Sequence, residues 1–90
     1  MVEYKIIFSK QAKKDQKKLK SSKLEKKSKD LLILMIKDPF IEPPFFESLR
    51  DNLKEFYSRR INQQHRLVYA VDEKKKEIYV VRMWSHYEKL

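Results

Sequence analysis

The chain has 90 residues, of which 22 are lysine or arginine and 13 are aspartate or glutamate, so its formal net charge is +9. This length allows one domain with one modest core, which we place at residues 1–90. The sequence contains no cysteine, which excludes disulfide frameworks and thiol nucleophiles. The longest apolar run covers only residues 31–36, so neither a signal peptide nor a transmembrane helix is expected, and a soluble cytoplasmic protein without membrane association is predicted.

Residues 4–8 are aromatic and β-branched, which predicts a first strand. Ser9 can cap a helix over residues 10–20, and the serines at 21 and 22 interrupt that helix. Ser22 and Glu25 have capping-box spacing, which predicts the start of a second helix that ends at Asp38 before a proline. These two helices form a helical hairpin.

Residues 39–46 contain three prolines and are predicted to be an extended loop. Strand-like runs follow at residues 55–61, 65–71 and 77–83, with polar turns between them. Because the chain has no glycine, Asn and Asp are expected at any turn position with positive φ. The order β-α-α-β-β-β predicts an α+β domain. In it, a two-helix hairpin follows the N-terminal strand and packs on one face of a four-stranded antiparallel sheet.

Alternation along the strand at residues 65–71 assigns its two faces. Leu67, Tyr69 and Val71 share the more apolar face, which should meet the helices. Arg66 then points to the open face of the sheet, where a ligand could lie.

The positive charge is unevenly distributed. Residues 1–38 hold 12 lysines against five acids, whereas all five arginines lie after residue 49. Such a charge favours a polyanion as partner, and the charge alone does not distinguish nucleic acid from lipid headgroups. The lysine-rich half indicates long-range attraction, and the arginine half indicates oriented phosphate contacts. The lysine candidates for RNA contact are Lys13, Lys14, Lys17 and Lys18, in a cluster that is expected to be a solvated face that also adds long-range attraction.

An ordered string of residues in the second half resembles a known family. Residues 56–61 read Phe-Tyr-Ser-Arg-Arg-Ile and residues 65–69 read His-Arg-Leu-Val-Tyr. Glu-Ser-Leu at 47–49 and Asn-Leu at 52–53 precede them, and Arg82 and a His-Tyr pair at 86–87 follow. This pattern resembles the YoeB/Txe toxins of bacterial type II toxin–antitoxin systems, in the RelE superfamily. The resemblance is close over residues 47–87 and covers the helical half in outline.

The resemblance implies a RelE-like fold and a ribosome-dependent mRNA endoribonuclease that needs no metal or cofactor and leaves a 2′,3′-cyclic phosphate and a 5′-hydroxyl. It implies Glu47 as the general base, His86 as the general acid, Arg66 as the group that stabilises charge on the scissile phosphate, and Tyr87 as an orienting residue. Histidine suits the acid role because its ordinary pKa lies near neutrality. The implied partners are the ribosome, mRNA and a cognate acidic antitoxin of the YefM/Axe kind.

Other roles are less specific. Arg59 and Arg60 would hold flanking phosphates, whereas Arg82 could make either an ion pair or a phosphate contact. His65 is expected to support structure through a hydrogen bond. The chain continues for three residues past Tyr87, unlike typical members of the family.

Two alternatives remain open at this point: a non-catalytic basic RNA- or DNA-binding module of the same fold, and a toxin-like protein that has lost its activity. Glu47 favours the enzyme, because a basic binder has no need of a carboxylate that repels phosphate. The oligomeric state is also open, with a homodimer as one option.

Overall fold

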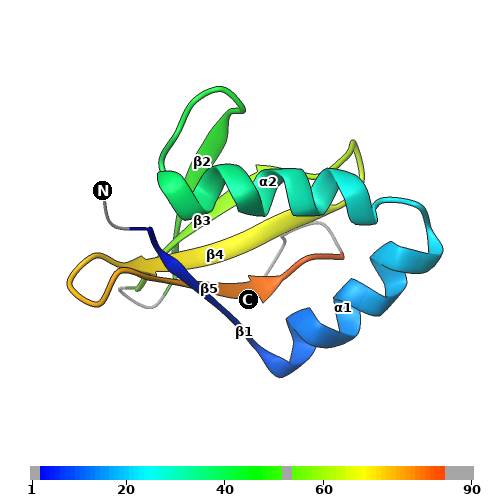
Figure 1. The fold of residues 1–90 in the computed structure, drawn as a ribbon, viewed down its shortest axis with the longest axis horizontal. Coiled ribbons are helices and arrows are strands. Elements are labelled where there is room, and N and C mark those ends of the chain that lie inside the picture. The colour runs from blue at the N-terminus through cyan, green and yellow to red at the C-terminus, as the bar shows by residue number, and fades with distance from the viewer. Residues whose placement is uncertain (1–2, 52–53, 85–90) are drawn as a thin grey trace.

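The computed structural model describes residues 3–51 and 54–84 (Figure 1). These described residues form two helices and five strands. In chain order they are β1 (Lys5–Phe8), α1 (Lys10–Ser21), α2 (Glu25–Lys37), β2 (Phe46–Asp51), β3 (Lys54–Arg60), β4 (Arg66–Asp72) and β5 (Glu77–Arg82). Within the described ranges, neither helix is long and apolar enough to span a membrane.

The strands form one sheet in the order β1-β5-β4-β3-β2. β1 runs parallel to β5, and the other neighbours are antiparallel. The α+β class, the helical hairpin and the last three strands are therefore confirmed, but the sheet has five strands and is mixed instead of four-stranded and antiparallel. The additional strand is β2, which follows the proline-rich loop and pairs along β3 from Phe46, opposite Arg59, to Asp51, opposite Lys54.

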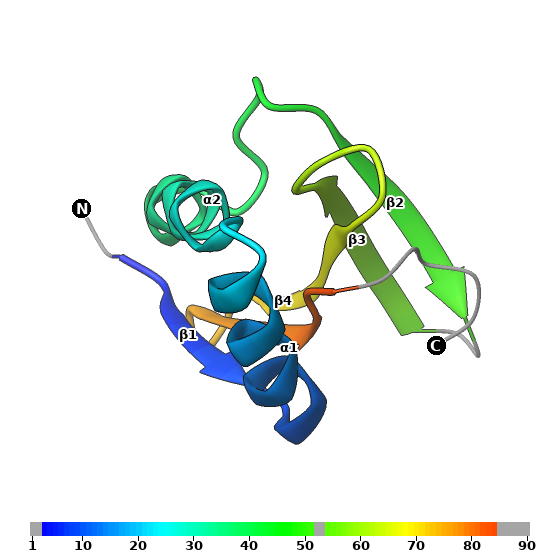
Figure 2. The ribbon, with the colours of Figure 1, turned by 90° about the vertical axis from the view of Figure 1, so that its right-hand side faces the viewer.

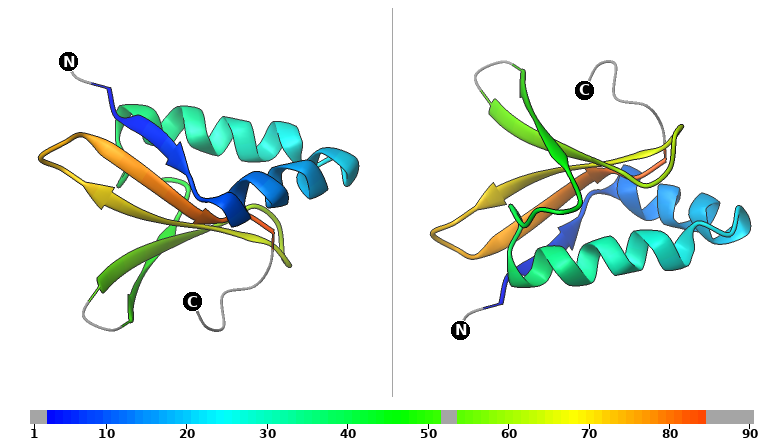
Figure 3. Two further views of the ribbon diagram at one scale, coloured as in Figure 1. Left: turned by 90° about the horizontal axis from the view of Figure 1, so that it is seen from below. Right: turned by 90° about the horizontal axis from the view of Figure 1, so that it is seen from above.

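Both helices lie on the same side of the sheet, as Figure 2 shows. The hairpin of β2 and β3 curves away from them, so part of the sheet is not covered by a helix (Figure 3). Leu67 and Tyr69 of β4 are fully buried in a core that they share with residues of both helices, which confirms that this face of the strand meets the helices. The core also takes residues from both helices and from β5, namely Ala12, Leu19, Leu31, Leu32, Met35, Ile78 and Val80.

The two predicted helix caps, at Ser9 and Ser22, differ in outcome. Ser9 caps α1 as expected, because its Oγ accepts a hydrogen bond from the Ala12 N–H at 3.0 Å. The predicted capping box is wrong: Ser22 closes α1, its hydroxyl donates back to the Leu19 carbonyl, and α2 begins after Leu24 without a side-chain cap.

Two lysines adopt the left-handed backbone conformation. Lys23 has φ 64° and Lys76 has φ 55°, so the expectation that Asn and Asp would fill such positions is wrong. At Lys23 the conformation lets the Leu24 N–H bond to the Leu19 carbonyl at 3.0 Å, which is the closing bond of a Schellman motif. The tight turn between the helices therefore depends on a residue type that disfavours its geometry.

Candidate active site on the open face of the sheet

Glu47 and Arg66 meet on the uncovered part of the sheet. Glu47 lies on β2 and Arg66 at the start of β4, and Arg66 Nη1 is 3.4 Å from Glu47 Oε1. The side chain of Arg66 is 19% exposed and that of Glu47 is 44% exposed, so an incoming ligand can reach the pair. A partly exposed ion pair adds only about 0–1 kcal/mol to stability, so stability alone gives little reason for these two residues to meet.

A second arginine lies directly opposite Arg66. Arg60, at the end of β3, is paired with Arg66 in the register of the sheet and is exposed. Side chains of directly opposed residues share one face, and like charges at such positions repel each other. An anion bound between the two guanidinium groups would relieve this repulsion. The pairing therefore indicates an anion-binding site beside Glu47.

Ser58 lies between these strands. It is opposite Glu47 on one side and opposite Val68 on the other, and it is only 2% exposed. Within the described part of the chain its Oγ has no hydrogen-bond partner, although it is buried. Ser58 is therefore a small, buried polar group directly beside the candidate base.

Arg59 occupies a different place from its neighbour Arg60. It is 1% exposed and points to the helix side of β3. Its guanidinium donates to the carbonyls of Pro39, Ile41 and Pro44 and to the Tyr69 hydroxyl, over distances from 2.7 to 3.2 Å. A phosphate could reach it only if the loop that joins α2 to β2 moved away. The expected phosphate contact of Arg59 is therefore replaced by a structural role.

Arg82 makes the ion pair that was one of its two expected roles. Its Nε is 3.2 Å from Oδ2 of Asp15, an α1 residue that is fully buried. The same oxygen accepts a hydrogen bond from the Met83 N–H at 2.9 Å, and Asp15 Oδ1 accepts one from Gln11. Asp15 thus fastens the end of β5 to α1. The sequence carries a signal for this role, because Asp15 lies three residues after Ala12 and four before Leu19, on the buried stripe of the helix.

His65 and Trp84 stack on each other. Their ring centroids are 4.0 Å apart with an interplanar angle of 19°, and His65 is 7% exposed. This buried stack supports the expected structural role of His65 by a contact that the sequence did not indicate. The other two predicted catalytic residues, His86 and Tyr87, lie outside the described residues.

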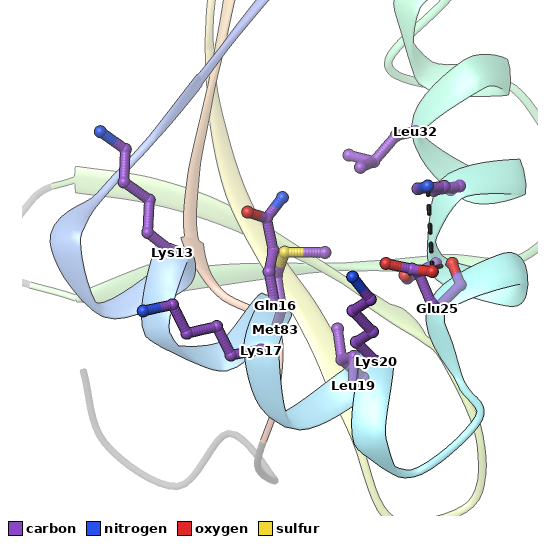
Figure 4. Close-up of a pocket in the computed structure, with 10 residues that line it drawn as sticks. Lys13, Gln16, Lys17, Leu19, Lys20, Glu25, Leu32 and Met83 are labelled. Carbon is purple, nitrogen blue, oxygen red and sulfur yellow. Dashed lines mark hydrogen bonds and ion pairs between the residues drawn. The ribbon is translucent and has the colours of Figure 1, made fainter.

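The lysine candidates are all exposed on α1. Lys13 and Lys17, together with Lys20, line a groove of about 390 Å³ between α1 and α2, whereas Lys14 and Lys18 do not. Figure 4 shows Lys13, Lys17 and Lys20 on α1: Lys20 extends toward Glu25 of α2, whereas Lys13 and Lys17 point away from α2. Met83, which directly follows β5, lies between the two helices. The groove combines an apolar floor with a basic rim, which suits a polyanion or an acidic protein segment better than a small neutral ligand.

Metal ligation has no candidate group in the described ranges, where no cluster of three or more His, Asp or Glu side chains is close enough to hold an ion. The chemistry that the open face offers is that of a carboxylate in contact with one guanidinium group, with a second arginine opposite on the neighbouring strand. A carboxylate can accept a proton, and guanidinium groups stabilise a charged phosphate.

Comparison with known proteins gives the family. A family model described as the YoeB-like toxin of bacterial type II toxin–antitoxin systems matches residues 8–87. The chain belongs to the YoeB-like toxin family. Toxin YoeB of Synechocystis sp. is 34% identical over 67 residues, which cover 74% of this chain and 76% of that protein.

Two solved structures of YoeB from Staphylococcus aureus are also similar. The YoeB dimer matches with a TM-score of 0.79 and 37% identity, covering 96% of this chain and 100% of that one. The YoeB–YefM complex matches with a TM-score of 0.77 and 37% identity, covering 93% and 98%. The α+β fold and the family membership expected from the sequence are thereby confirmed, and the chain is a toxin component of a type II system.

Proposed function

We propose that this YoeB-like toxin is a ribosome-dependent endoribonuclease that cleaves mRNA. The observation that carries the proposal is the contact between Glu47 and Arg66 on the open face, with Arg60 opposite Arg66. These groups suit the transesterification of RNA, which needs an acceptor for the 2′-hydroxyl proton and cationic groups at the phosphate. A module that only binds nucleic acid has no use for an accessible carboxylate in the middle of its phosphate site.

In this mechanism Glu47 removes the proton of the 2′-hydroxyl, and the 2′-oxygen attacks the adjacent phosphorus. Arg66 stabilises the negative charge that develops on the phosphoryl oxygens, and Arg60 holds a neighbouring phosphate. The bond between phosphorus and the 5′-oxygen then breaks, and we assign His86 the role of donating a proton to that oxygen and Tyr87 the role of orienting the phosphate. The products are a 2′,3′-cyclic phosphate and a 5′-hydroxyl, and no step requires a metal ion.

The same family membership suggests the protein partner. Because a related toxin forms a complex with YefM, we propose a cognate acidic antitoxin for this chain. Its acidic side chains would match the basic rim of the groove between α1 and α2 and the arginines of the open face. The YoeB dimer of Staphylococcus aureus makes a homodimer of this chain a further proposal.

The test is to map the ends of the RNA fragments. Ribosomes programmed with mRNA are incubated with the toxin, and the expected fragments carry 5′-hydroxyl and 2′,3′-cyclic phosphate ends. His86→Gln keeps a hydrogen-bond donor but cannot release a proton near neutral pH, so we expect the rate to fall about 10²–10⁴-fold. Fragments with 5′-phosphates, or full activity of His86→Gln, would show that this mechanism is wrong.

A further inference from the structure

The loop of residues 39–45, which leads directly into β2 and Glu47, depends on Arg59 for its shape. Three of its residues are prolines, which have no N–H to donate, so the carbonyls of the loop need donors from elsewhere. Arg59 Nη2 donates to the carbonyls of Pro39 at 3.0 Å and Ile41 at 2.9 Å, and Nη1 donates to that of Pro44 at 2.7 Å. One guanidinium therefore holds the beginning, the middle and the end of the loop.

Tyr69 completes this arrangement from β4. Its hydroxyl accepts a hydrogen bond from Arg59 Nε at 3.2 Å and donates one to the Pro39 carbonyl at 2.8 Å. Both side chains are almost fully buried, and their bonds cross from the sheet to the loop. Arg59 serves four acceptors from three nitrogens, whereas the ammonium of lysine has only three donors, all on one nitrogen.

Arg59 also contacts the residue next to Glu47. It is opposite Phe46 in the register of β2 and β3, and its Cζ lies 5.0 Å from the centre of the Phe46 ring. Phe46 packs further against Phe40 and Tyr57. Because successive residues of a strand point to opposite faces, holding Phe46 on the helix side places Glu47 on the open face, and a shift of one residue would reverse this.

The buried charge of Arg59 is tied to the loop by its hydrogen bonds. A buried charge is costly to desolvate, and the described partners of Arg59 are carbonyls, a phenol and aromatic rings, none of which carries a compensating negative charge. Its hydrogen bonds to the loop offset this cost, and an apolar residue at this position would leave the same carbonyls without a donor. The hydrogen bonds of Arg59 fix the conformation of the loop that leads into β2 and Glu47, which an apolar side chain could not do.

We propose that Arg59 is a positioning residue for Glu47: through the loop of residues 39–45 and Phe46, it sets the position of the Glu47 carboxylate next to Arg66. This inference rests on the proposed role of Glu47 as the general base. Arg59 would thus affect catalysis from the interior of the protein, on the side of the sheet opposite the substrate.

A double-mutant cycle tests this coupling. Single-turnover cleavage on programmed ribosomes is measured for the wild type, Arg59→Lys, Glu47→Gln and the double variant. Arg59→Lys should lower the rate by about 10²-fold, the loss typical of a misplaced catalytic group, and should have no further effect when Glu47 is already replaced. If the two losses multiply, or if Arg59→Lys keeps the wild-type rate, the proposal is overturned.

Two further variants separate positioning from a general loss of stability. Ile78→Ala creates a cavity in the core on β5, away from the loop, and should slow cleavage much less than Arg59→Lys at a temperature where both proteins are folded. Tyr69→Phe removes one hydrogen bond to Pro39 and one acceptor of Arg59, and should give a smaller loss that also disappears in the Glu47→Gln background. An equal loss in Ile78→Ala would contradict positioning.

Hydrogen exchange tests the same inference without any activity. In Arg59→Lys the backbone amides of residues 46–48 should exchange faster, while those of Ile78 and Val80 on β5 stay protected. Unchanged protection at residues 46–48 in the folded variant would overturn the proposal even if the toxin cleaves RNA. Absence of cleavage by the wild type would instead overturn the proposed function, and the exchange result would still decide whether Arg59 holds this strand.

Discussion

Tyr57, on the helix side of β3, has a pKa that its surroundings raise, and this shift can be measured. Its hydroxyl donates a hydrogen bond to Glu55 Oε1 at 2.6 Å, and its ring packs against Phe40 and Phe46. Burial raises the pKa of Tyr57 to about 12, and the hydrogen bond and the negative charge of Glu55 act in the same direction. The folded protein therefore holds this proton more tightly than the unfolded chain does.

This difference in pKa makes stability depend on pH. Between the ordinary tyrosine pKa of 10.0 and the folded value of about 12, the unfolded chain releases the Tyr57 proton while the folded protein keeps it. The contribution of Tyr57 to the free energy of unfolding is therefore complete below pH 10 and decreases as the pH rises toward 12. Denaturant unfolding of the wild type and Tyr57→Phe over this range should show the wild type losing more stability than the variant. Parallel curves would contradict the prediction.

The two adjacent arginines show what can be predicted at the residue scale. Alternation along β3 places Arg59 on the same face as Tyr57 and Ile61, which pack in the core. This position on an apolar face indicates that Arg59 is buried. At this position the strand face indicates the environment of the side chain better than its charge does. The family resemblance indicates Glu47 and Arg66, but their 3.4 Å contact depends on the pairing of β2 with β3, for which the sequence carries no local signal.

At the scale of elements, β2 could not be predicted because its stability comes from pairing. Residues 46–51 follow a proline-rich loop, and the strand forms against β3 with the Phe46 ring packed on Phe40 and Tyr57. The helices and the last three strands carry their signals locally, in the cap at Ser9 and in alternating apolar residues, so they were predicted nearly to their ends. Long-range pairing has no comparable local signal.

The turn between the two helices offers a test at this scale. Lys23 takes φ 64°, a conformation that costs a residue with a Cβ about 1–2 kcal/mol and costs glycine little. Lys23→Gly should therefore raise the free energy of unfolding by about 1 kcal/mol, measured by urea denaturation. Lys23→Ala is the matched control, because it removes the same charge but keeps the Cβ, and it should leave stability nearly unchanged. A destabilised glycine variant would contradict the account of this turn.

At the scale of the whole molecule, the charge separates into two regions with different tasks. The exposed lysines of α1 face solvent and the groove between the helices, whereas Glu47, Arg60 and Arg66 lie on the open face of the sheet. In the proposed function, the first region attracts a polyanion over a distance, and the second fixes a phosphate in one geometry. Binding and chemistry should therefore respond differently to mutation.

Replacement of Lys13, Lys14, Lys17 and Lys18 by glutamine tests the first region. Each lost phosphate contact should reduce the slope of log Kd against log salt concentration by about 0.7–0.9, so ribosome binding should weaken and depend less on salt. The control is Lys74→Gln with Lys75→Gln in the turn between β4 and β5, at the far end of the molecule from α1 (Figure 1). The control removes two lysines and the test variant four, so an equal change in slope per lost lysine would show that only net charge matters.

The most direct test of the central claim is the single-turnover rate of Glu47→Gln on mRNA in a saturated ribosome complex. Glutamine keeps the size and polarity of the side chain but cannot accept the 2′-hydroxyl proton, so we expect the rate to fall about 10²–10⁴-fold while the affinity for the ribosome stays near that of the wild type. A Glu47→Gln variant that cleaves at the wild-type rate would contradict the claim that this YoeB-like toxin uses the open face of its sheet to cut RNA.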